Sequence, residues 1–194
     1  MTAFTGNSIL ICGVGGQGTL LMSKTLTAGL VQAGYDVKMS EVHGMAQRGG
    51  SVSTQVRYGE KIYSPIIGRG EADVLVAFEK LEAVRYSGLL RPGGLALIND
   101  YEVMPLPVAS GAAEYPQNIA EEMRRAFDTR IIPASAIASG LGNIRCTNIV
   151  LLGALVRAFH LESIDWNAAL TESVPPKVLP LNLAAFDAGY RFEA

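Results

Sequence analysis

The chain has 194 residues, of which 49% are hydrophobic and 18% charged, a composition typical of a globular protein rather than a disordered one. Sixteen Lys and Arg against eighteen Asp and Glu leave a net charge of −2, with no basic excess for nucleic acid or an anionic membrane surface. We therefore expect a single domain over residues 1–194, without a nucleic-acid or membrane partner.

The two cysteines, Cys12 and Cys146, lie far apart and form no CxxC pair. This pattern argues against a disulfide framework and is typical of the reducing cytoplasm. It also excludes a self-contained zinc ribbon or iron–sulfur cluster, which needs about four soft ligands. Residues 1–8 lack the features of a signal peptide, and the longest apolar run, 149–159, is shorter than the roughly 20 residues of a membrane span. We expect a cytoplasmic protein with no metal site of its own.

Hydrophobic periodicity predicts strands that alternate with helices along the chain. In chain order, the first half is expected to contain a strand at 8–12, a helix at 19–33, strands at 37–42, 51–57 and 72–78, and a helix at 79–90. The second half is expected to contain a strand at 95–99, a helix at 118–127, a strand at 130–133, and helices at 148–160, 165–172 and 179–190. Residues 100–116 give no clear pattern, because prolines and a glycine interrupt them.

This order predicts an α/β, doubly wound fold with a mostly parallel sheet, helices on both faces and a helical C-terminal tail. The first two strands and the helix between them predict a βαβ unit with a parallel crossover. A turn at 58–60 predicts a β-hairpin between 51–57 and 61–63. The apolar helix at 148–159 and the tail at 179–190 are expected to bury against the sheet, a second copy or a partner chain.

Two local features complete the prediction of the elements. Ser163 is the expected N-cap of the helix at 165–172. Glu79, Glu82 and Arg85 fit a solvated helix face with i,i+3 pairing.

A glycine-rich turn joins the first strand to the first helix. Its sequence, Gly13-Val-Gly-Gly-Gln-Gly18, satisfies G-x-G-x-x-G in the strand–turn–helix context that the motif needs. Such a turn offers free helix N–H groups to an anion, and Asp36 or Glu41 lies near the position of a ribose-binding carboxylate. The alternative is a turn that only allows close packing. Thr19 stands where a triphosphate-binding loop needs lysine, which argues against ATP hydrolysis. The residues of this glycine loop are Gly13, Gly15, Gly16, Gln17 and Gly18.

The segment Ser40-Glu-Val-His-Gly-Met-Ala-Gln-Arg-Gly-Gly-Ser51 connects two predicted strands, at the edge where open α/β sheets bind ligands. Arg48 offers a forked donor to a carboxylate or phosphate. His43 titrates near neutrality and is the one candidate general acid or base, but no acid or nucleophile motif accompanies it. A solvated loop is the alternative. The candidate residues that face a substrate, coenzyme A or a partner's active site are His43, Gln47, Arg48, Gly49, Gly50 and Ser51.

These two segments, with Ser64-Pro-Ile-Ile-Gly-Arg-Gly-Glu-Ala-Asp-Val-Leu-Val-Ala-Phe-Glu79, resemble the gamma-type domain of 2-oxoacid:ferredoxin oxidoreductases. The likeness continues through Gly142-Asn143, 148–155 and 182–190, so it covers most of the chain in order. The form Glu-Val-His-Gly-Met-Ala-Gln-Arg-Gly-Gly at 41–50 favours the beta subunits of the indolepyruvate branch.

The resemblance implies the oxidative decarboxylation of a 2-oxoacid with coenzyme A, which yields an acyl-coenzyme A, carbon dioxide and reduced ferredoxin. This chain has no Gly-Asp-Gly start of a thiamine diphosphate motif and no cysteine cluster. The resemblance therefore places thiamine diphosphate, Mg²⁺ and [4Fe-4S] clusters on a catalytic alpha subunit. This chain would be an accessory subunit, inactive alone, that binds none of them and caps the partner's active site. Because two of its predicted helices are apolar, a homodimer is one expected state of the isolated chain.

Two other classes of function are compatible with the residues. The glycine loop alone fits a stand-alone dinucleotide-binding module of Rossmann type, although the segment at 40–51 is then unexplained. A purely structural assembly subunit is the third interpretation.

Overall fold

A computed structural model describes residues 6–44 and 49–193. Its strands form one six-stranded sheet. The strands are β1 (Gly6–Val14), β2 (Asp36–His43), β3 (Ser51–Gly59), β4 (Ala72–Ala77), β5 (Leu90–Asn99) and β6 (Asp128–Ile132). The helices are α1 (Thr19–Gln32), α2 (Lys80–Tyr86), α3 (Leu106–Ala109), α4 (Ile119–Ala126), α5 (Ala134–Gly140), α6 (Thr147–Ala158), α7 (Trp166–Ser173) and α8 (Leu179–Arg191).

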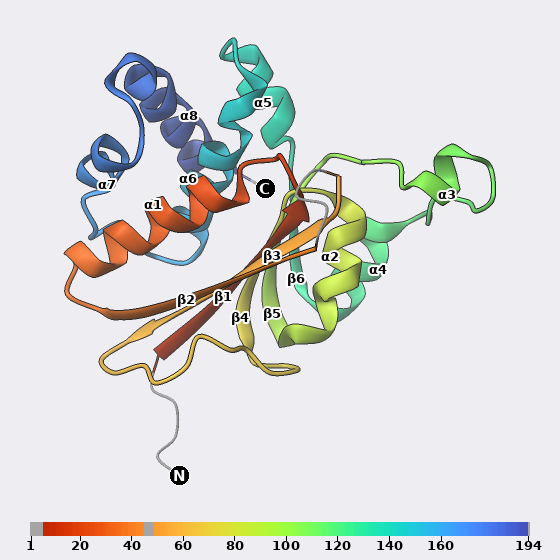
Figure 1. Cartoon of the computed structure of the whole chain (residues 1–194), viewed down its shortest axis with the longest axis horizontal. Coiled ribbons are helices and arrows are strands. Elements are labelled where there is room, and N and C mark those ends of the chain that lie inside the picture. The colour runs from red at the N-terminus through yellow and green to blue at the C-terminus, as the bar shows by residue number, and fades with distance from the viewer. Residues whose placement is uncertain (1–5, 45–48, 194) are drawn as a thin grey trace.

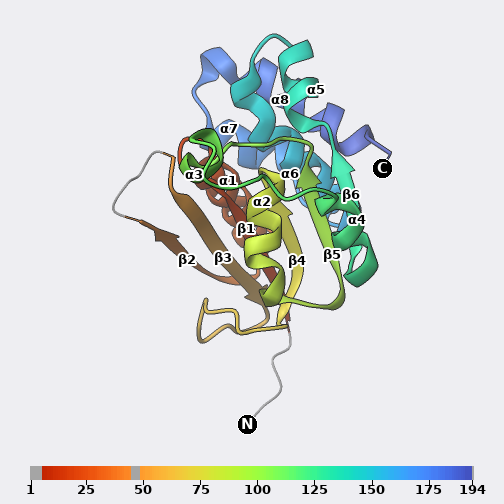
Figure 2. The same cartoon turned by 90° about the vertical axis from the view of Figure 1, so that its right-hand side faces the viewer.

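The sheet has the order β2-β3-β1-β4-β5-β6, and helices cover both of its faces (Figures 1 and 2). Strands β1, β4, β5 and β6 pair in parallel, whereas β3 pairs antiparallel with both β1 and β2. Because β3 is antiparallel to both of its neighbours, β1 and β2 run in the same direction. The expected α/β, mostly parallel, doubly wound class with a helical tail is confirmed.

The strand pairing around β3 corrects two predictions. Strands β1 and β2 run parallel, as the βαβ pattern predicts, but β3 lies between them and they do not touch. The expected hairpin between 51–57 and 61–63 is wrong, because 61–63 form no strand. Strand β3 instead pairs with β1 and β2. Strand β2 is its nearest neighbour along the chain, and the sequence pattern does not predict this antiparallel pair.

Two apolar cores lie on the two faces of the sheet. Alternate β1 residues supply them, since Ile9 and Ile11 belong to the first core and Leu10 and Cys12 to the second. The first core also contains α1, α6, α7 and α8, and the second contains α2 and α4. Figure 1 shows these two groups of helices on opposite sides of the sheet.

Helices α6 and α8 pack on each other through two glycines. A Cβ on Gly153 would lie 2.1 Å from the Phe186 carbonyl oxygen, and one on Gly189 would lie 1.9 Å from that of Val150. Only glycine allows this approach. These two helices therefore bury apolar surface against each other and in the core on this face of the sheet, within one chain.

Smaller differences concern element ends. Asp165, not Ser163, is the N-cap of α7, because its side chain accepts the Ala168 N–H at 3.0 Å. Helix α2 ends at Tyr86 rather than at 90, and a 3₁₀ turn at Ser87–Leu89 follows it. Helix α5 is not predicted by the sequence pattern. In the described part of the chain, no helix has both the length and the apolarity that a membrane crossing requires.

Candidate functional site

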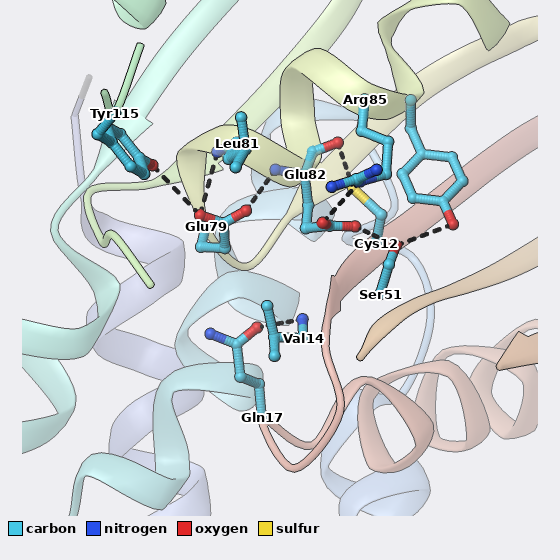
Figure 3. Close-up of polar contacts among 10 residues, drawn as sticks. Cys12, Val14, Gln17, Ser51, Glu79, Leu81, Glu82, Arg85 and Tyr115 are labelled. Carbon is cyan, nitrogen blue, oxygen red and sulfur yellow. Dashed lines mark hydrogen bonds and ion pairs between the residues drawn. The ribbon is translucent and has the colours of Figure 1, made fainter. Parts of the chain in front are cut away.

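The glycine loop lies at the carboxyl end of β1, in the centre of the sheet edge. Its shape is held from within, because Gln17 Oε1 accepts the Val14 N–H at 2.7 Å (Figure 3). It is also held from α6, where Asn148 Nδ2 donates to the Gly18 carbonyl at 3.2 Å. Gly18 is the N-cap of α1 with a φ of 87°, and no side chain caps the first N–H groups of that helix. These groups are available to an anion or a polar ligand.

The two segments that the sequence singles out meet at this loop. The Gly15 N–H donates to the Gly50 carbonyl at 2.8 Å, and the Gly49 N–H donates to the Gly15 carbonyl at 3.2 Å. Ser51 lies opposite Val14 in the pairing of β1 with β3. Two further candidates, Gln47 and Arg48, lie outside the described residues.

One cavity, which we call pocket 1, opens beside the glycine loop and has a volume of about 400 Å³. The start of α1 and the ends of β2 and β3 enclose it. Glu41 and His43 of β2 line it, whereas Asp36 does not, because it lies at the other end of that strand. Its lining residues are Gly15, Gly16, Gly18, Thr19, Leu20, Glu41, Val42, His43, Val52, Ser53 and Thr54.

His43 has no catalytic environment among the described residues. Its side chain is exposed, and its Nδ1 lies 3.3 Å from the neighbouring Gly44 carbonyl oxygen. No carboxylate of the described chain contacts the ring. The described geometry therefore places His43 in the lining of pocket 1, and its role as a general acid or base stays a prediction.

A second cavity, pocket 3, lies on the other side of the glycine loop and has a volume of about 190 Å³. The sequence does not predict it, because its walls come from five separate segments. Its lining residues are Gly16, Gln17, Phe78, Asn99, Tyr101, Ser135, Ile144, Arg145 and Thr147. Unlike pocket 1, it has no Asp or Glu among these residues.

Arg145 gives pocket 3 a cation. Its backbone N–H donates to Asn143 Oδ1 at 3.0 Å, which makes Asn143 the N-cap of the 3₁₀ turn Ile144–Cys146. Its guanidinium is exposed and makes no ion pair within the described chain. Across the pocket, Asn99 Nδ2 donates to Ser135 Oγ at 2.8 Å, which fixes that hydroxyl group beside the cavity. Pocket 3 is therefore suited to an anionic group.

The two glutamates at the start of α2 are buried, which corrects the prediction of a solvated helix face. Glu79 is 1% exposed and Glu82 is 4% exposed. Glu79 caps α2 by accepting the N–H groups of Leu81, at 3.1 Å, and Glu82 (Figure 3). The predicted i,i+3 pair is confirmed, since Arg85 Nε lies 2.9 Å from Glu82 Oε1.

Burial changes the titration of this cluster. Desolvation raises the pKa of Glu79, and the nearby Glu82 carboxylate raises it further, while the N–H groups at the helix start oppose the shift. Burial and the same two glutamates raise the pKa of the Cys12 thiol well above its usual value. Cys12 is therefore a packing residue rather than a nucleophile.

The described residues contain no group of three or more His, Cys, Asp or Glu side chains that is arranged to hold a metal ion. The polar groups at the sheet edge include backbone N–H groups, hydroxyls, one carboxylate in pocket 1 and one guanidinium in pocket 3.

Comparison with known proteins gives the same family as the sequence motifs. The family model described as pyruvate ferredoxin/flavodoxin oxidoreductase matches residues 8–192. The indolepyruvate oxidoreductase subunit IorB of Pyrococcus horikoshii is 39% identical over 192 residues, which cover 95% of this chain and 94% of that protein.

Solved structures agree. A 2-oxoglutarate:ferredoxin oxidoreductase from Magnetococcus marinus, with 2-oxoglutarate, coenzyme A and succinyl-CoA bound, is 26% identical with a TM-score of 0.76. The match covers 96% of the present chain and 31% of the Magnetococcus chain. The keto/oxoacid ferredoxin oxidoreductase gamma subunit of Geobacter sulfurreducens, 24% identical, has the same fold with a TM-score of 0.70 and coverage of 95% and 96%. The chain belongs to the pyruvate ferredoxin/flavodoxin oxidoreductase family and is homologous to the subunits of 2-oxoacid oxidoreductases.

Proposed function

We propose that this chain is the accessory subunit of an indolepyruvate or arylpyruvate:ferredoxin oxidoreductase and that it presents coenzyme A to the active site of a catalytic partner. The observation that carries the proposal is the pair of pockets that share one glycine loop at the sheet edge. Open α/β sheets bind ligands at this edge. Relatives named for indolepyruvate support the substrate class, and the coenzyme A in the Magnetococcus structure supports the co-substrate.

The two pockets differ in charge, so we assign different parts of coenzyme A to each of them. Pocket 3, with Arg145 and without a carboxylate, suits a phosphate group. Pocket 1 contains Glu41, which repels an anion but accepts hydrogen bonds from sugar hydroxyls. The uncapped N–H groups at the start of α1, where Thr19 and Leu20 line pocket 1, suit a diphosphate.

The partner's surface is expected to cover this edge. Four large apolar residues that line the two pockets are 40–52% exposed, and a partner would bury them. These residues are Leu20, Val42, Tyr101 and Ile144. Covering the edge would also exclude water from the reacting centre, which strengthens every polar interaction there.

The partner would hold thiamine diphosphate, Mg²⁺ and the [4Fe-4S] clusters that pass electrons to ferredoxin. The thiamine group supplies the decarboxylation chemistry when it is bound. The only two cysteines of this chain are both buried and distant in sequence, so neither belongs to a cluster motif. The isolated chain is accordingly expected to be inactive.

The stand-alone dinucleotide-binding interpretation is not favoured, because nearly the whole chain matches a family of oxidoreductase subunits. The glycine loop and Glu41 beside it are compatible with that interpretation, but Glu41 fits the ribose of coenzyme A equally well.

The test is anaerobic co-expression of this chain with the thiamine- and cluster-bearing chain, followed by an assay of coenzyme A-dependent viologen reduction. We expect activity with indolepyruvate or phenylpyruvate only when both chains are present. Activity limited to other 2-oxoacids would retain the subunit role and reject the substrate class. A partner that works equally well alone would reject the proposal, and NAD titration of the isolated chain would then test the dinucleotide interpretation.

A further inference from the structure

A buried carboxylate contacts Ser51, next to the segment that pairs with the glycine loop, from the face of the sheet opposite to α1. The side chain of Glu82, in the first turn of α2, is 5% exposed. Its Oε2 accepts the hydroxyl of Ser51, whose oxygen also lies 3.3 Å from the Tyr86 hydroxyl (Figure 3). Its Oε1 accepts Arg85 Nε at 2.9 Å. Both carboxylate oxygens therefore have a donor, and one of those donors belongs to the candidate site.

Helix formation does not explain this carboxylate. Glu79 already caps α2 and accepts the N–H groups of Leu81 and Glu82. Moving a carboxylate out of water is costly, and an apolar side chain would fill the same space without that cost. What sets Glu82 apart is its hydrogen bond with Ser51, which is the first residue of β3.

The position of Ser51 is linked to pocket 1 through the backbone that precedes it. It follows Gly50, whose carbonyl accepts the Gly15 N–H at 2.8 Å, and Gly49 donates back to the Gly15 carbonyl at 3.2 Å. Gly15 lines pocket 1, whereas neither Ser51 nor Glu82 does. We propose that Glu82 is a positioning residue that holds Ser51, and through it the pairing of Gly49 and Gly50 with Gly15, in the shape that ligand binding at the glycine loop requires. This inference rests on the proposed function for its effect on catalysis.

The structural part is tested by amide hydrogen exchange on the full chain, measured by NMR at Gly15 and Gly49. Ser51→Ala is expected to speed exchange at both amides about tenfold, the order that one hydrogen bond to a charged group supplies. Glu82→Ala should do the same, and Glu82→Gln, which keeps an acceptor for Ser51, should restore slow exchange. Unchanged exchange at both amides in Ser51→Ala would overturn the inference, even if Glu82→Ala does not fold.

The control is Glu122→Gln. Glu122 and Arg125 form the same i,i+3 pair on α4, but both side chains are exposed and neither contacts the glycine loop. This variant should leave exchange at Gly15 and Gly49 as in the wild type. Acceleration at both amides in the control, equal to that in Ser51→Ala, would overturn the inference.

The functional part is tested in the assembled two-chain enzyme. Ser51→Ala is expected to raise the KM for coenzyme A about tenfold, with kcat within about twofold of the wild-type value. If Arg145→Gln raises this KM and Ser51→Ala does not, the positioning role is wrong and the proposed function stands. If neither variant changes it, both the positioning role and the coenzyme A assignment are wrong.

Discussion

The two helical layers on either face of the sheet are built from different chemistry. On one face, α6 and α8 are so close that a Cβ on Gly153 or Gly189 would overlap a backbone carbonyl of the other helix, and α6 is buried over most of its length. On the other face, which also has an apolar core, Glu79 and Glu82 are buried at the start of the short helix α2, and Glu82 accepts the Ser51 hydroxyl at the start of β3. The first layer is held by apolar packing, whereas the second adds buried polar contacts that cost desolvation energy.

This difference teaches that stability and site geometry are separated in the chain. Apolar packing is non-directional and holds many residues at once, so it secures the fold. A buried carboxylate is directional and holds one partner, so it suits the placement of a single loop. Changes in the α6–α8 layer should therefore alter stability, and changes at the sheet edge should alter ligand binding.

The largest expected effect is that of Gly189→Ala. The new Cβ would lie 1.9 Å from the Val150 carbonyl oxygen, so the two helices must separate. We expect a loss of about 3 kcal/mol or more in the free energy of unfolding, measured by urea denaturation. Gly140→Ala, on a helix with nothing within 4 Å of the new Cβ, is the control and should not destabilise the chain. Equal losses in both variants would contradict this account of the packing.

Arg145→Gln should change ligand binding and leave stability unchanged. The guanidinium is exposed at pocket 3, so its loss is expected to leave the melting temperature unchanged. In the assembled enzyme, the KM for coenzyme A should rise about tenfold, because a charge-assisted contact to phosphate is lost. Arg124→Gln, at an exposed arginine on α4, should leave the same KM unchanged. A KM that does not respond to Arg145→Gln would remove the anion assignment of pocket 3.

Glu79→Gln tests the buried carboxylates of the α2 layer through the pH dependence of stability. Because burial raises the pKa of Glu79 in the folded chain, the folded state binds this proton more tightly than the unfolded state. The contribution of Glu79 to the free energy of unfolding therefore falls as pH rises from about 4.5 through the raised pKa. Gln does not titrate, so its stability relative to the wild type should improve between pH 4 and pH 7. A difference that is independent of pH would contradict the buried, desolvated carboxylate.

The smallest effect is expected at the opposite end of the sheet, for Asp36→Asn. The Ile62 N–H and the Lys38 ammonium lower the pKa of Asp36 to about 2. A lowered pKa gives stability above pH 3.8 that is lost as pH falls towards 2. The variant should thus have a slightly lower urea midpoint at pH 7, and most of this difference should be lost at pH 2. A midpoint difference of the same size at pH 2 and pH 7 would exclude this ion-pair origin.

Most of the fold can be predicted from the sequence, because the periodicity of hydrophobic residues indicates which residues are buried. This periodicity does not indicate which strands pair with each other. The alternation in 51–57 identifies β3 correctly, but the insertion of this strand between β1 and β2 depends on contacts across the whole sheet. The same limit explains why 61–63 are mistaken for a strand.

Half of the candidate site is predictable for the same reason. Glycines in a strand–turn–helix context identify the loop at 13–18, and the pairing of Gly15 with Gly50 joins it to the second predicted segment. Pocket 3 is missed because its residues are scattered along the chain. The burial of Glu79 and Glu82 is missed because i,i+3 pairing with Arg85 is the usual mark of a solvated face.

The central claim is that the sheet edge with the two pockets receives coenzyme A in the assembled enzyme. The direct measurement is hydrogen–deuterium exchange of this chain within the two-chain complex, with and without coenzyme A. We expect coenzyme A to slow exchange in peptides that cover 13–20 and 49–54, and to leave peptides of 60–71 unchanged. Protection confined to 60–71, or none at the glycine loop, would contradict the claim.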